Sequence, residues 1–80
     1  GIIAPSFANN SALDYYNAGR NFQQRENFAR AIEYYQESLL INPDYADAWI
    51  GLAECAYEMD EGSFLYLQEK TKRLLASKMS

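Results

Sequence analysis

Two stretches of this chain repeat the same pattern of apolar and small residues at an offset of 34 positions. The paired positions are Tyr15 and Trp49, Ala18 and Leu52, Gly19 and Ala53, and Phe22 and Ala56. A period of about 20 to 50 residues is typical of folds in which copies of one small unit stack side by side. Pro43 lies between the two copies. We therefore interpret it as a boundary between units, and not as a kink in one long helix or the end of a domain.

Helical periodicity runs through most of the chain, because apolar and small residues recur at three- and four-residue steps. We expect four helices: about residues 12–25, about 28–41, a third from Pro43 to the "DEG" of residues 60–62, and a fourth that opens at Ser63. No stretch alternates apolar and polar residues as a strand would. The expected buried faces contain, in chain order, Leu13, Tyr15, Ala18, Gly19 and Phe22; Phe28, Ala31, Ile32, Tyr35, Ser38 and Leu39; Trp49, Leu52, Ala53 and Ala56; and Phe64, Leu67, Thr71, Leu74 and Leu75.

Capping residues mark the expected ends of these helices. Ser11, followed by Asp14 three residues later, is an acidic variant of the capping box. Asn27 in "RENF" is the expected site of the turn between the first two helices. Asp44 is expected to cap the third helix, with Asp47 in its first turn.

The stretches "YYNAGRNF", "AIEYY" and "NP" together resemble the tetratricopeptide repeat pattern. The matching residues are Tyr15, Ala18, Gly19, Phe22, Ala31, Tyr35 and Pro43. This resemblance implies an all-α fold of antiparallel helix-turn-helix repeats, of the α-solenoid type, and a role in binding other proteins. The second copy departs from the pattern, because Ala56 and Thr71 stand where the family has aromatic residues. We expect an N-terminal arm at residues 1–11, a first repeat at 12–45, and a second, degenerate repeat with a terminal helix at 46–80.

Composition argues against several classes of function. The chain has 80 residues and a net charge of −4, which disfavours a surface for nucleic acids. It contains no histidine, the commonest general base, and its single cysteine, Cys55, can form neither an intrachain disulfide nor a paired-cysteine zinc site. Glu54 and Glu58 flank Cys55 and should raise the pKa of its thiol. We expect no catalysis, no cofactor, no metal and no membrane insertion.

The resemblance implies that the first helices of successive units line a concave groove. The residues offset from the expected buried faces there are Tyr16, Arg20, Gln23, Asp47, Ile50, Glu54, Tyr57 and Glu58. Tyrosine and isoleucine offer apolar contact area, and the acids place negative charge along one helix face. This groove is expected to bind a protein or peptide segment that is apolar and carries Lys or Arg. In the alternative interpretation, the tyrosines only pack on neighbouring helices and the acids only face solvent.

Two repeats are fewer than the roughly three that such arrays usually need for stability. The chain is therefore either part of a longer array or a protein that pairs with its own copy. Ile2, Ile3 and Phe7 in the arm are expected to cover the edge of the first helix or to reach a second chain. The alternative function is a self-associating structural module, a possible homo-oligomer, whose main contact is its own copy or a neighbouring repeat.

Overall fold

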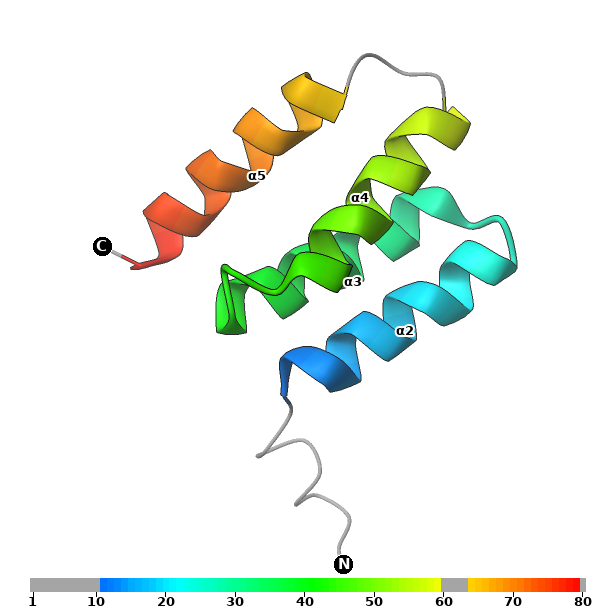
Figure 1. The fold of residues 1–80 in the computed structure, drawn as a ribbon, viewed down its shortest axis with the longest axis horizontal. Helices are drawn as coiled ribbons and strands as arrows, with labels where there is room; N and C mark the ends of the chain where they lie inside the picture. Colours follow the sequence, from blue (N-terminus) through cyan, green and yellow to red (C-terminus); the bar gives the residue numbers. More distant parts are fainter. Residues whose placement is uncertain (1–10, 60–63, 80) are drawn as a thin grey trace, which may run out of the picture.

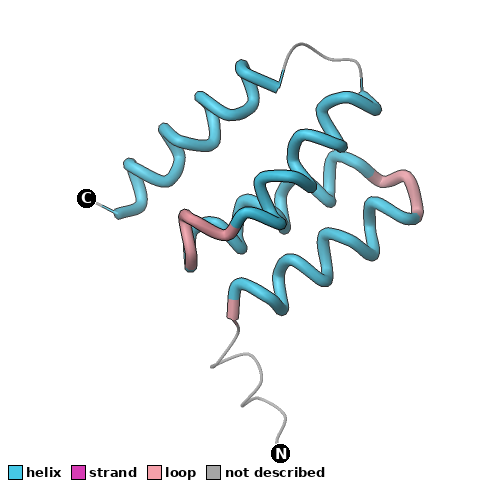
Figure 2. The backbone as a smooth tube through the Cα atoms, viewed as in Figure 1, coloured by secondary structure: helices cyan, strands magenta, loops and turns pink. Residues whose placement is uncertain are grey.

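The computed structural model describes residues 11–59 and 64–79, and within these ranges it contains helices and no strands (Figures 1 and 2). The helices are α2 (Ala12–Gln24), α3 (Phe28–Ile41), α4 (Ala46–Met59) and α5 (Phe64–Met79). The expected all-α class is confirmed, and the two first helices end within one residue of their predicted limits. The expected arm contacts of Ile2, Ile3 and Phe7, and the expected boundary between the third and fourth helices at residues 60–63, lie outside the described residues.

The predicted capping box opens α2. The Ser11 hydroxyl accepts a hydrogen bond from the backbone N–H of Asp14 at 3.3 Å, and the Asp14 carboxylate accepts one from the N–H of Ser11 at 3.1 Å. Two amides that the first helical turn cannot pair internally are thereby satisfied.

The turn between α2 and α3 includes the expected Asn27, and the residue before it has a left-handed backbone conformation. Glu26 has a positive φ of 62°, whereas Asn27 is the N-cap of α3. The Asn27 side-chain oxygen accepts from the N–H of Arg30 at 3.4 Å, and the Asn27 N–H donates to the Phe22 carbonyl at 2.9 Å. Asn27 therefore joins the end of one helix to the start of the next.

The expected cap at Asp44 is wrong. Because α4 begins at Ala46, the preceding residue is Tyr45, whose carbonyl accepts from the N–H of Trp49. Asp44 belongs to the turn instead, since its N–H donates to the side-chain oxygen of Asn42 at 3.1 Å.

The two glycines of the helices meet one aromatic ring in the core. Tyr35 on α3 is fully buried. A Cβ atom added to Gly19 on α2 would lie 2.7 Å from its Cε1 atom, and one added to Gly51 on α4 would lie 2.5 Å from its Cζ atom. The ring thus occupies the space that the missing side chains leave, and it brings α2, α3 and α4 into close contact.

The buried face of α4 is wider than the sequence predicted. Leu52 and Ala56 are buried as expected, but Trp49 and Ala53 are only partly buried. Three further residues of α4 are buried: Ala48, Gly51 and Cys55. The reason is that α4 lies between α2 and α5 and also contacts α3, so it packs on several sides (Figure 1).

The other expected faces are mostly correct. The α3 positions are confirmed, with Ala31, Tyr35, Ser38 and Leu39 buried and Phe28 and Ile32 partly buried. On α5, Thr71 and Leu75 are buried. Leu13 is a correction, because its side chain is 52% exposed at the outer edge of the first turn of α2.

Candidate functional site

Helices α2 and α4 contact each other, and the eight expected groove residues lie on them. Tyr16, Arg20 and Gln23 are on α2. Asp47, Ile50, Glu54 and Tyr57 follow at three- and four-residue steps along α4, and Glu58 lies four residues after Glu54, so they share one face of that helix. We call the surface formed by these eight residues the α2–α4 face.

Gln23 connects three helices at this face. Its side-chain N–H donates to the Glu54 carboxylate at 2.8 Å, and its side-chain oxygen accepts a hydrogen bond from the Tyr35 hydroxyl. Burial raises the pKa of Tyr35, so the hydroxyl remains protonated and able to donate at neutral pH. The hydrogen-bonded chain from Tyr35 through Gln23 to Glu54 therefore fixes α2 and α4 relative to each other.

Tyr16 is held between aromatic neighbours. Its ring centroid lies 5.7 Å from that of Tyr35 and 5.5 Å from that of Tyr45, both in tilted arrangements. The Arg20 guanidinium donates to the Tyr16 hydroxyl at 3.2 Å and also lies 6.0 Å from the ring centroid. The hydrogen bond to Tyr16 raises the pKa of Arg20 above its ordinary value. The alternative interpretation, in which the tyrosines pack on neighbouring helices, therefore applies to Tyr16, whose ring packs against Tyr35 and Tyr45.

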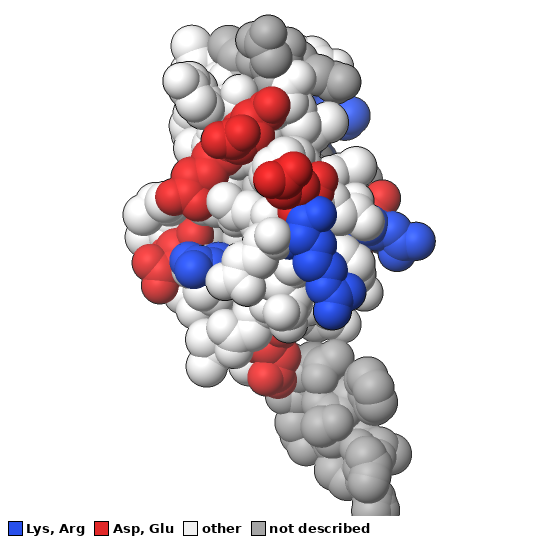
Figure 3. Space-filling view, turned by 90° about the vertical axis from the view of Figure 1, so that its right-hand side faces the viewer, with Lys and Arg blue, Asp and Glu red and all other residues white. Residues whose placement is uncertain are grey.

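The α4 side of the face carries apolar side chains that the fold does not cover. Ile50 is 55% exposed and Tyr57 is 83% exposed. Asp47, Glu54 and Glu58 are also exposed on this helix. In the view of Figure 3, acidic side chains form a nearly continuous run across one face, with basic side chains beside it. The face therefore combines uncovered apolar area with negative charge.

Cys55 has the environment of a structural thiol. It is fully buried, and burial together with the nearby carboxylates of Glu54 and Glu58 raises its pKa to about 11. A thiol with this pKa is almost entirely protonated at neutral pH and is a poor nucleophile. Within residues 11–59 and 64–79, no three Cys, Asp or Glu side chains form a cluster suited to a metal ion.

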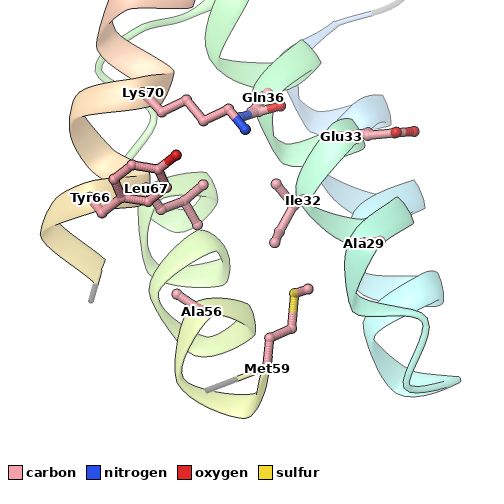
Figure 4. A pocket seen from close by; sticks show the side chains of 9 residues that line it. All are labelled: Ala29, Ile32, Glu33, Gln36, Ala56, Met59, Tyr66, Leu67 and Lys70. Atoms are coloured by element: carbon pink, nitrogen blue, oxygen red, sulfur yellow. The ribbon is translucent and has the colours of Figure 1, made fainter. Parts of the chain in front are cut away.

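A pocket that no sequence pattern indicated lies between α3, α4 and α5 (Figure 4). It has a volume of about 330 Å³ and is lined by Ala29, Ile32, Glu33, Gln36, Ala56, Met59, Tyr66, Leu67 and Lys70. Gln36 donates to the Thr71 hydroxyl at 3.0 Å, which links α3 to α5 beside the pocket. Such a hollow depends on the angle at which α5 packs, and no local pattern in the sequence encodes that angle.

The helices in the described part of the chain fall short of the length and hydropathy that crossing a bilayer would require.

Comparison with protein families gives one match. A family model described as tetratricopeptide repeat matches residues 22–63, which is more than half of the chain. The match begins near the end of α2 and includes all of α3 and α4. Comparisons with curated proteins and with solved structures found no significant match.

Proposed function

Because this chain belongs to the tetratricopeptide repeat family, we propose that it is a non-catalytic interaction module that binds a peptide segment of a partner protein along the α2–α4 face. Members of this family generally serve as protein–protein interaction modules. The observation that carries the proposal is that the face has a hydrogen-bonded part and, beside it, exposed apolar side chains. One part is fixed by the bonds of Gln23 to Tyr35 and Glu54, and beside it Ile50 and Tyr57 remain largely exposed.

A preorganised surface supports binding because little conformational freedom is lost when the partner arrives. The Gln23–Glu54 hydrogen bond and the packing of Tyr16 hold the floor of the face in place before any partner is present. Exposed Tyr57 offers a large, rigid ring with a hydroxyl group, which is typical of residues that dominate binding energy.

The charge of the face indicates the chemistry of the partner. Asp47, Glu54 and Glu58 are exposed along α4, and Arg20 is the basic member of the face. A segment with apolar side chains for Ile50 and Tyr57, and with Lys or Arg for the acids, satisfies both parts of the surface.

A second candidate, self-association, is supported by a separate observation. Leu65 and Tyr66 at the start of α5 are 67% and 63% exposed, although both are large apolar side chains. Uncovered apolar side chains close together on one helix are a common feature of surfaces that bind another protein chain.

The test is peptide binding measured by surface kinetics, with a panel of peptides that combine apolar residues with Lys or Arg. Replacing Tyr57 with Ala should accelerate dissociation by about tenfold or more, because removal of a central anchor typically costs about 2 kcal/mol. Leu65→Ala is the matched control, since it removes a similarly exposed apolar side chain from a different helix. Equal effects of the two substitutions would contradict binding at the α2–α4 face.

A further inference from the structure

One exposed side of α5 has the chemistry that the α2–α4 face is proposed to bind. Tyr66, Lys70 and Arg73 follow one another at steps of four and three residues, so they share one side of the helix. All three side chains are exposed. They present one aromatic ring and two positive charges.

The same steps recur on α4. Ile50, Glu54 and Tyr57 are also spaced by four and then three residues, and all three are exposed. When the two helices are aligned in parallel, Tyr66 falls opposite Ile50 and Lys70 falls opposite Glu54. Arg73 then falls opposite Tyr57, with Glu58 as the next residue of α4.

We propose that the α2–α4 face of one chain binds helix α5 of a second copy of the same chain; this inference rests on the proposed function of that face. The contact joins apolar Tyr66 to Ile50, pairs Lys70 with Glu54, and places the Arg73 guanidinium against the ring of Tyr57 and the carboxylate of Glu58. The two helices have 14 and 16 residues, so they can lie side by side over nearly their full lengths.

The fold prevents a chain from satisfying its own face in this way. In the described residues α5 contacts α3 and α4 but not α2, and α4 lies between α2 and α5 (Figure 1). Within one chain, α4 and α5 meet at the pocket of Figure 4, whose lining includes Ala56 and Leu67; Tyr66 and Lys70 line the same pocket but remain exposed. The α2–α4 face must therefore receive α5 from another molecule.

The two surfaces in this contact are different, so the association is head to tail. After two copies pair, the dimer still has one unoccupied face, on one copy, and one unoccupied α5, on the other. Assembly should then continue beyond a dimer as the protein concentration rises, and it should weaken at high salt because exposed charges are screened.

A charge-swap experiment with the full chain tests the contact. One variant carries Glu54→Lys and Glu58→Lys, and the other carries Lys70→Glu and Arg73→Glu. Each variant alone should associate with a dissociation constant raised about tenfold or more, measured by sedimentation velocity, because like charges then face each other. An equimolar mixture should recover association, because each variant then meets an oppositely charged partner. Recovery in the mixture also shows that both variants are folded.

The control reverses two positive charges elsewhere, with Arg25→Glu and Arg30→Glu on the α2–α3 hairpin, and should leave association unchanged. A wild-type chain that stays monomeric at all concentrations would overturn the inference, as would a mixture that associates no better than its components. The Lys70→Glu, Arg73→Glu variant should still bind the basic and apolar peptides, since its α2–α4 face is intact. A wild-type chain that binds these peptides but does not self-associate at any concentration would therefore reject this inference and leave the proposed function standing.

Discussion

Gly19 on α2 and Tyr35 on α3 occupy a shared space, since a Cβ atom on the glycine would lie 2.7 Å from Cε1 of the tyrosine ring. The ring is also held by α4 and by Gln23, because a Cβ atom on Gly51 would lie 2.5 Å from its Cζ atom and its hydroxyl donates a hydrogen bond to Gln23. Close packing of three helices at this point therefore depends on two residues that have no side chain.

Gly19→Ala should therefore destabilise the protein, even though alanine is the better helix former. We expect a net loss of about 1 to 3 kcal/mol in the free energy of unfolding, measured by urea denaturation, because the added methyl group overpacks the core. The control is the same substitution combined with Tyr35→Leu, in which the ring is absent. If Gly19→Ala costs as much in that background as in the wild type, the ring is not the cause.

Glu26→Gly should stabilise the protein. Glu26 has a φ of 62°, a conformation that glycine adopts without the cost paid by other residues. The expected gain is about 1 kcal/mol or less in the free energy of unfolding. Asn27→Gly is the control, and it should be neutral or destabilising because it removes the hydrogen bond to the Arg30 N–H. Thermal melts that rank the two variants in the opposite order would contradict this account of the turn.

The helices and the turns between them differ in how well the local sequence pattern predicts them. The helices were predictable because three- and four-residue periodicity is strong over Phe28–Ile41 and in the other helices. The details of the turns were not, because a shift of one residue, such as that from Asp44 to Tyr45, leaves the composition of a turn unchanged. The choice between such neighbours is made by individual hydrogen bonds, such as that of the Asn27 N–H with the Phe22 carbonyl, which the composition of a turn does not specify.

Contacts between residues far apart in the sequence could not be predicted. The exposed positions on α4 could be predicted from the phase of the helix, but the bond between Gln23 and Glu54 could not, because it depends on how far α2 and α4 are offset along their axes. Burial of Ala48 was missed for a related reason. A single predicted face per helix does not account for a helix that packs on several neighbours.

The stability of the protein should fall in alkaline solution through Cys55. Its thiol has an ordinary pKa of 9.0 and a folded-state pKa of about 11, raised by burial and by nearby Glu54 and Glu58. Between these values the unfolded chain loses a proton that the folded chain keeps. The free energy of unfolding therefore decreases as the pH rises from 9 to 11, by on the order of 2 kcal/mol, and the contribution is fully present below pH 9.

Urea denaturation of wild type and Cys55→Ala at a series of pH values isolates this contribution. Burial also raises the pKa of the Tyr35 hydroxyl, which both proteins retain, and the Cys55 thiolate adds to that shift, so the difference between the two proteins includes this coupling. The difference between their free energies of unfolding should change between pH 9 and 11 and stay constant below. A constant difference over the whole range would show that the thiol is not desolvated in the folded protein.

Reversing the charge of the α2–α4 face should change how fast a partner arrives. Glu54→Lys with Glu58→Lys should lower the association rate of a basic and apolar peptide by about tenfold or more at low salt, and should flatten its dependence on salt, because exposed charges act mainly on the encounter. The dissociation rate should change less than it does in Tyr57→Ala. Glu33→Lys with Glu37→Lys is a matched control, since these acids are also exposed and four residues apart, but on α3. An equal loss of association rate in both double variants would mean that net charge alone steers the peptide, whereas a loss confined to the α4 pair would locate the encounter at the face that carries Ile50 and Tyr57.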